Sequence, residues 1–166
     1  MRIREATVAD AAAIAAVHVR GWQHAYRGIL GDDFLDGIPV VERTAGWTRA
    51  LTAGEAPTLL SVTAERVTGF ACVSASRDDD RHEGVGELVA IYVDPGEQGT
   101  GAGRALMTAA LDRLRERHTE ATLWVLARNE RAQRFYRAAG WHFDGTTKDV
   151  TVGGTPVTEH RYRRAL

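Results

Sequence analysis

A glycine-rich segment between two apolar patterns limits most strongly what this chain can fold into. In VDPGEQGTGAGRALM, residues 93–107, glycines stand at the alternate positions 99, 101 and 103. The six consecutive apolar residues 88–93 lack the alternation of a half-exposed strand and are typical of a central strand covered on both faces. After the glycines, apolar residues recur at helical spacing, at Leu106, Ala110, Leu111 and Leu114. The pattern predicts a strand, a loop and a helix, in that order.

Two well-known glycine motifs do not fit this segment. The dinucleotide-binding motif G-x-G-x-x-G requires a glycine where the sequence has Arg104. The nucleoside-triphosphate motif G-x-x-x-x-G-K requires a lysine where the sequence has Ala102. What remains is a Q-x-x-G-x-G pattern over residues 98–103.

The backbone of this loop suits the binding of phosphate. No proline occurs from 96 to 104, so every residue there offers an N–H group, and glycines permit turns that aim several of these groups inward. The first turn of the following helix adds unpaired N–H groups and the positive end of the helix dipole, and Arg104 adds a full charge. We therefore expect a pyrophosphate site; the alternative is an ordinary glycine-rich turn between a strand and a helix.

The first part of the chain predicts a strand followed by helices. Residues 2–6 alternate as a short strand does, and Thr7 with Asp10 resembles a capping box that opens a helix. Residues 21–51 contain glycine, aspartate and Pro39 as helix breakers, which predicts two helices joined by a loop.

The second half predicts a hairpin and another strand and helix. Residues 58–64 and 67–76 are β-rich and suit a hairpin, and residues 77–86 read as a polar loop. A strand over 122–127 precedes a helix within 129–140. Two more strands are expected around the Gly-Gly pair near the end of the chain.

Composition places these elements in one domain, residues 1–166, because 166 residues with 44% hydrophobic content bury a sizeable core. The 21 basic and 22 acidic residues give no electrostatic case for nucleic acid or for a membrane, so a small partner is expected. Charges interrupt the apolar residues at the N-terminus, which argues against a signal peptide or a membrane span. The single cysteine, Cys72, fits a reducing compartment, and we expect a cytoplasmic protein. The six histidines show no paired ligand spacing, so no metal is expected.

At its two strand-and-helix units the sequence resembles the GNAT superfamily of acetyl-CoA-dependent N-acetyltransferases. The resemblance is strongest over residues 87–107 and 123–143, and the order of strands and helices along the chain agrees with it. It implies an α/β fold with a central mixed β-sheet flanked by helices. It also implies that two central parallel strands, here 87–93 and 122–127, splay apart to admit the pantetheine arm of coenzyme A.

The same resemblance implies which residues bind acetyl-CoA. In the family the Q-x-x-G-x-G loop holds the pyrophosphate, and the strand before it pairs through its backbone with the pantetheine arm. The implied pyrophosphate site consists of Gln98, Gly99, Thr100, Gly101, Ala102 and Gly103, with Arg104 alongside. The implied pantetheine strand contributes Ile91, Tyr92 and Val93.

Asn129 and Tyr136 are predicted to face one groove. They are seven residues apart, and at 100° per residue they fall within roughly 20° of each other on a helix. By the resemblance, Asn129 bonds the pantetheine arm and Tyr136 protonates the departing thiolate. From the residues alone, Asn129 also suits a helix cap and Tyr136 a half-buried packing role.

Acetyl transfer requires a neutral amine, whereas a free alkylamine is mostly protonated at pH 7, so a base must accept a proton directly or through water. Glu87 is the candidate, because a glutamate at this place is the base in the histone acetyltransferase branch of the family. The alternative is a solvated acid at the end of a strand. By the same resemblance, a backbone N–H near Ile91 or Tyr92 meets the charge that develops on the carbonyl oxygen.

We therefore expect a sequential N-acetyltransferase that moves the acetyl group of acetyl-CoA directly to a primary amine of a small molecule or peptide. The alternative is a noncatalytic acyl-CoA-binding sensor that keeps the loop. Family members acetylate protein N-termini, lysines, polyamines, aminoglycosides and small amino compounds, so the resemblance does not identify the acceptor. The sequence also leaves open whether the protein forms a homodimer.

Acceptor specificity in the family lies in variable segments, which correspond here to 21–36 and 148–158. The aromatic residues Trp22, His24 and Tyr26 suit either an acceptor pocket or the core, and Trp47 is equally open. The aspartate triplet 78–80 suits either attraction of a cationic amine or a solvated loop.

Overall fold

A computed structural model describes residues 1–54 and 56–166, and its seven strands form one sheet in the order β1-β2-β3-β4-β5-β7-β6. The strands are β1 (Arg2–Glu5), β2 (Thr58–Thr63), β3 (Arg66–Ala75), β4 (Val85–Val93), β5 (Glu120–Leu126), β6 (His142–Val152) and β7 (Thr155–Ala165). Neighbouring strands are antiparallel except β4 and β5, which are parallel. This mixed sheet confirms the predicted fold class.

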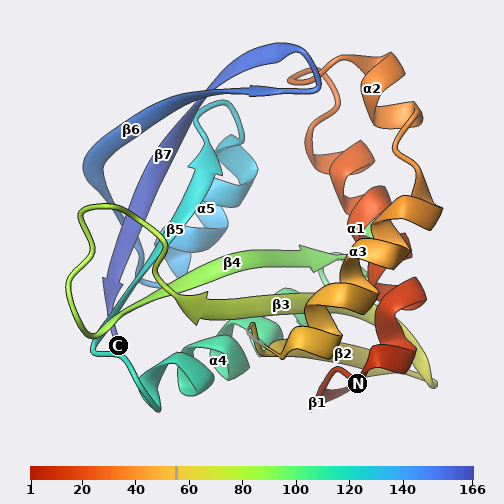
Figure 1. Cartoon of the computed structure of the whole chain (residues 1–166), viewed down its shortest axis with the longest axis horizontal. Helices are drawn as coiled ribbons and strands as arrows, with labels where there is room; N and C mark the ends of the chain where they lie inside the picture. Colours follow the sequence, from red (N-terminus) through yellow and green to blue (C-terminus); the bar gives the residue numbers. More distant parts are fainter. Residues whose placement is uncertain (55) are drawn as a thin grey trace.

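Helices cover both faces of the sheet (Figure 1). They are α1 (Ala11–Ala25), α2 (Asp32–Asp36), α3 (Val40–Ala53), α4 (Ala102–Arg115) and α5 (Glu130–Ala138), with 3-10 turns at Val8–Asp10 and Pro95–Glu97. The predicted apolar stripe of α4 is buried against one face of the sheet, and Leu106 and Ala110 are its most enclosed members. On the other face, Ile14 of α1 packs on Phe70 of β3. The core thus has one layer on each side of the sheet, as burial of two apolar faces requires.

The structure corrects two predicted boundaries. Residues 21–51 contain the end of α1, the short helix α2 and most of α3, rather than two helices. The extra helix, α2, is a short helix between Gly31 and Gly37, so the glycines before Pro39 limit its length but do not prevent it. The predicted polar loop 77–86 is shorter, since β4 begins at Val85. Val85 and Gly86 pair with β5, and a Cβ on Gly86 would lie 2.5 Å from the Leu114 side chain, so this glycine allows β4 to pack closely on α4.

The two central parallel strands splay apart, as expected. Their pairing covers three positions and ends where Glu87 of β4 faces Thr122 of β5. Beyond that point β4 continues along β3 and β5 continues along β7, and the two strands diverge (Figure 1). An irregularity in the pairing of β4 with β3 leaves Val89 without a partner at the start of the divergence. The opening therefore exposes one backbone edge of β4.

No helix in the described part of the chain is long and apolar enough to cross a membrane. Within the same residues, no group of three or more His, Cys, Asp or Glu side chains is arranged to hold a metal ion.

Candidate functional site

A cavity of about 970 Å³ lies at the opening between β4 and β5. Its walls come from α1, β4, the glycine loop, α4, β5 and α5. Its lining includes residues of the glycine loop and Trp124 of β5. A single cavity therefore joins the predicted phosphate-binding loop to residues of the β5 strand.

The glycine loop has the open backbone that phosphate binding requires. Gly99 and Gly101 have φ values of +84° and +92°, in the region that favours glycine. Gly101 precedes the first residue of α4, and no side chain caps that helix, so its first-turn N–H groups remain available to an anion. Of the seven residues predicted for this site, five line the cavity: Gln98, Gly99, Gly101, Gly103 and Arg104. Thr100 instead donates its hydroxyl to the Glu97 carbonyl at 2.7 Å, and Ala102 is buried in α4.

Asp94 anchors the loop and was missed by the sequence analysis. Its carboxylate accepts a hydrogen bond from the Gly96 N–H at 3.2 Å and two from the Arg20 guanidinium, at 2.6 and 3.1 Å. Burial by itself would raise the pKa of Asp94, but these bonds and the Arg20 charge outweigh it, so the pKa lies below its ordinary value. The aspartate before a Pro-Gly pair was a usable signal, because such side chains cap short turns. Arg20 carried no such signal.

The three residues predicted for pantetheine binding, Ile91, Tyr92 and Val93, all line the cavity. They belong to the part of β4 that has left β5. Their backbone groups on that edge lack a strand partner, and an extended ligand can supply one in the manner of an added strand.

Asn129 and Tyr136 both line the cavity from the start and the middle of α5. The Asn129 side-chain oxygen accepts the Ala132 N–H at 3.1 Å, so the residue does cap the helix. A cap uses only the oxygen and leaves the amide N–H groups free to donate. Burial raises the pKa of Tyr136 above its ordinary value, and the nearby Tyr26 adds to this effect. Its phenol therefore keeps its proton at neutral pH.

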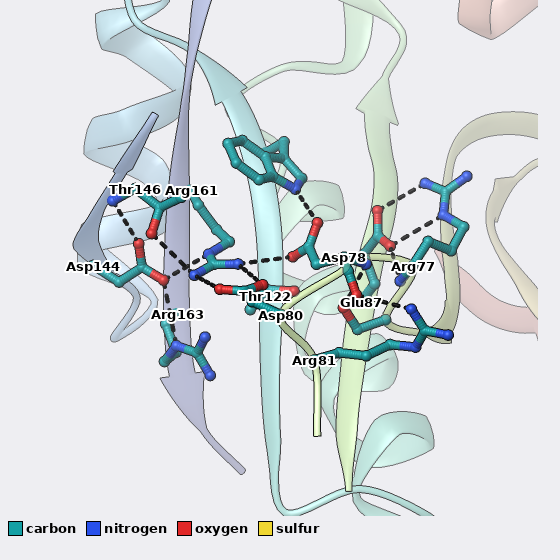
Figure 2. A network of polar contacts seen from close by, with 12 residues as sticks. Arg77, Asp78, Asp80, Arg81, Glu87, Thr122, Asp144, Thr146, Arg161 and Arg163 are labelled. Carbon is teal, nitrogen blue, oxygen red and sulfur yellow. Dashed lines mark hydrogen bonds and ion pairs between the residues drawn. The ribbon is translucent and has the colours of Figure 1, made fainter. Parts of the chain in front are cut away.

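Glu87 is placed differently from a solvated strand-end acid. It is 5% exposed, and its carboxylate accepts three hydrogen bonds from Arg77: one from the backbone N–H at 3.2 Å and two from the guanidinium at 3.1 and 2.7 Å (Figure 2). It is not among the described residues that line the cavity. Any proton transfer between Glu87 and a substrate in the cavity therefore needs a water molecule or a movement of Arg77.

The aspartate triplet is only in part the solvated loop that the sequence suggested as one alternative: Asp79 and Asp80 are exposed, whereas Asp78 is partly buried. Asp78 accepts the Trp124 indole N–H at 2.9 Å, and Asp78 and Asp80 both pair with the buried Arg161 of β7 (Figure 2). The Lys148 ammonium lies 3.8 Å from the Trp124 ring centroid. The loop after β3 is thus tied to β5 and β7, and it fixes the ring of Trp124, a residue that lines the cavity.

The candidate acceptor aromatics divide between the cavity and the core. His24 and Tyr26 line the cavity, and the Tyr26 hydroxyl lies 2.8 Å from the Tyr92 hydroxyl. Trp22 packs edge-on against Tyr26 in the apolar cluster around α2. Trp47 donates to His18 and packs on the α1 face of the sheet.

The family model, the two relatives and the solved structure to which this chain is similar are all described as acetyltransferases. The model of the acetyltransferase (GNAT) family matches residues 24–141. A probable N-acetyltransferase of Mycobacterium tuberculosis is 27% identical over 99% of this chain and 95% of its own length. A putative acetyltransferase from Salmonella typhimurium, solved with its cofactor acetyl-CoA, superposes with a TM-score of 0.75 at 24% identity, over 100% of this chain and 94% of that one. A mycothiol acetyltransferase of Kocuria rhizophila is 37% identical over 48% of this chain, which spans only 28% of that protein's length.

Proposed function

Because this chain belongs to the acetyltransferase (GNAT) family, we propose that it moves the acetyl group of acetyl-CoA directly onto a primary amine. The observation that carries the proposal is one cavity whose lining includes the open backbone of the glycine loop, Tyr136 of α5 and Trp124 of β5. A pyrophosphate fits one end of this cavity and a thioester fits between β4 and α5. The experiment that tests the proposal is release of CoA thiol in the presence of an amine.

The pyrophosphate, the pantetheine arm and the acetyl group of acetyl-CoA each have a matching group in the cavity. The amides of residues 98–104 and the Arg104 side chain bind the pyrophosphate. The free edge of β4 at residues 91–93 pairs with the two amides of the pantetheine arm, and the Asn129 amide donates to it from the other side. The acetyl carbonyl then lies near Ile91 or Tyr92, where a backbone N–H stabilises the charge that develops on oxygen, by about 3 kcal/mol.

Two residues transfer the protons of this reaction: Glu87 accepts one and Tyr136 donates one. The amine nitrogen attacks the carbonyl carbon, the carbon–sulfur bond breaks, and the amine loses one proton while the thiolate gains one. Glu87 accepts the first proton through water, since its carboxylate lies behind the cavity wall beside Arg77. Tyr136 gives the second proton to the thiolate, because its raised pKa keeps the phenol protonated.

Tyr136→Phe is expected to lower kcat by about a hundredfold while the dissociation constant of acetyl-CoA changes little. The substitution keeps the ring and its packing against Phe135 and removes only the proton donor. Because the phenol of the wild type stays protonated well above neutral pH, the deficit should be constant from pH 7 to 9. Steady-state CoA release and calorimetry measure the two quantities. Full turnover in the variant would reduce Tyr136 to a packing residue.

A noncatalytic acyl-CoA sensor is the second candidate, and the pairing of the buried Glu87 carboxylate with Arg77 is the observation that favours it. A panel of spermidine, an Nα-blocked lysine amide, an alanyl peptide and an aminoglycoside separates the two functions. The sensor binds acetyl-CoA and releases no CoA thiol with any of them. The transferase releases thiol with at least one amine and forms the acetylated product in equal amount.

A further inference from the structure

We propose that the paired hydroxyls of Tyr26 and Tyr92 bind the nitrogen of the acceptor amine. This inference rests on the proposed acetyl transfer and adds a group that recognises the amine. The chain has four tyrosines, and three of them, Tyr26, Tyr92 and Tyr136, line the one cavity that also contains the glycine loop. They come from the end of α1, from β4 and from α5, so the fold gathers them from distant parts of the sequence. The fourth, Tyr162, is buried in the core and is not among the described residues that line the cavity.

The position of the pair is fixed by the packing of α1 on β4. Tyr26 is the first residue after α1, and its hydroxyl oxygen lies 2.8 Å from that of Tyr92. The Tyr92 ring packs on Gly21 within α1, where a Cβ would lie 2.8 Å from the ring. A glycine inside a helix lowers helix stability, and here it makes room for the ring. This close contact brings the Tyr92 hydroxyl to the end of α1, where Tyr26 meets it.

The hydrogen-bonding capacity of the pair suits a neutral amine. Burial raises the pKa of both phenols, so both are neutral at physiological pH. When one hydroxyl donates to the other, the donor keeps its oxygen lone pairs free and can accept a further N–H. An amine that donates to this oxygen keeps its own lone pair for the carbonyl carbon. Two neutral phenols do not favour an ammonium ion as a carboxylate would, so the site selects the form of the amine that reacts.

The carboxylate and imidazole groups nearest the pair already have partners. Among the described residues that line the cavity, the only carboxylate is Glu97, next to the glycine loop. Glu87 is bonded to Arg77 (Figure 2), and the Nε2 atom of His24 lies 3.1 Å from the Arg131 guanidinium. Tyr136, the third phenol of the cavity, is assigned to the thiolate by the proposed mechanism, so the phenol oxygens of the Tyr26–Tyr92 pair are the neutral phenol acceptors that remain for an amine N–H.

The competing explanation is that the pair only joins α1 to β4. The charged and titratable groups that face it are His18, which packs on the Tyr92 ring, Tyr136, and Glu159, whose charge affects Tyr26. A purely structural pair predicts lower stability and no selective change in the kinetics of the amine. Amine binding predicts a change that depends on the amine and spares acetyl-CoA.

The test compares four variants: Tyr26→Phe, Tyr92→Phe, the double variant, and Tyr162→Phe as the matched control. The control removes a buried, hydrogen-bonded phenol hydroxyl outside the cavity. We expect each single variant to lower kcat/KM for the best amine of the panel by about tenfold, with acetyl-CoA affinity within about twofold of wild type. The double variant should lose little more than either single one, because the two hydroxyls act as a unit. Tyr162→Phe should keep wild-type kinetics.

The pH profile separates the pair from a base. Because neither phenol titrates in the working range, the deficit of Tyr26→Phe should be the same at pH 7 and pH 9. Wild-type values of kcat/KM in both single variants would overturn the inference, as would an equal loss in Tyr162→Phe.

A measurement of amine binding tests this inference separately from the proposed acetyl transfer. If no amine of the panel releases CoA thiol, the proposed transfer fails on that panel. Calorimetric titration of spermidine into the complex with CoA at pH 9, where more of its amine groups are neutral than at pH 7, then tests the pair directly, and the inference predicts about tenfold weaker binding to Tyr26→Phe than to wild type. Equal affinities, or no binding of spermidine to wild type, would overturn it.

Discussion

Gly101→Val is expected to reduce acetyl-CoA binding below calorimetric detection while the chain remains folded. Gly101 has a φ of +92° directly before α4, and a β-branched residue resists that conformation. The valine would therefore move the loop away from the geometry that aims its amides into the cavity. Its methyl groups would also stand where a phosphate must approach the backbone. Both effects weaken the binding of acetyl-CoA, so this variant should lose more affinity than a variant that strains the backbone away from the cavity.

Gly145→Val is the matched control for backbone strain. Gly145 has a φ of +90°, and, as at Gly101, no described atom lies within 4 Å of the Cβ that a side chain would add. It belongs to β6 and is not among the described residues that line the cavity. We expect its thermal stability to fall about as far as that of Gly101→Val, with acetyl-CoA affinity unchanged. Wild-type affinity in folded Gly101→Val would make the loop an ordinary turn between a strand and a helix.

The parts of this fold that were predictable are those set by local pattern. The apolar run before the glycines and the helical spacing after them act over a few residues, and both elements formed as expected, with Leu106 and Leu114 buried. The splay of β4 from β5 came from the resemblance to a family, since no local pattern shows where two strands stop pairing. The early start of β4 was missed because Gly86 reads as a loop residue until its contact with α4 is seen.

The polar contacts of the site were not predictable in the same way. Arg161 lies 83 residues from Asp78, and Arg20 lies 74 residues from Asp94, so the choice of partner depends on the finished topology. The same limit applies to Glu87. Its type and position were visible in the sequence, whereas its pairing with Arg77 depends on how the loop after β3 folds back. Because of that pairing, a test of Glu87 must distinguish a role as general base from a role as anchor of the loop after β3.

Glu87→Gln is expected to lower kcat/KM by about a hundredfold or more at neutral pH, within the usual range for a positioned general base. Glutamine has a similar size but cannot accept the proton. The deficit should shrink as pH rises, because an alkylamine with a pKa of about 10.4 is increasingly neutral and needs the base less. Acetyl-CoA affinity should change little, since Glu87 does not line the cavity. The measurement is a pH-rate profile with the best amine of the panel, for variant and wild type.

Arg77→Gln distinguishes a base from an anchor of the loop, because it breaks the same ion pair from the other side. If Glu87 only anchors the loop through Arg77, both variants lose activity by similar factors, and both deficits are independent of pH. If Glu87 accepts the proton, only Glu87→Gln shows a deficit that shrinks with rising pH, since Arg77→Gln retains the carboxylate. Arg77→Gln leaves a carboxylate that is 6% exposed without its cation, so it should be the less stable protein, by about 1–3 kcal/mol, since the arginine that it loses is itself largely exposed. Its profile is therefore compared only below the onset of its thermal unfolding. Profiles of equal height for Glu87→Gln and wild type would mean that bulk water or another residue takes the proton from the amine.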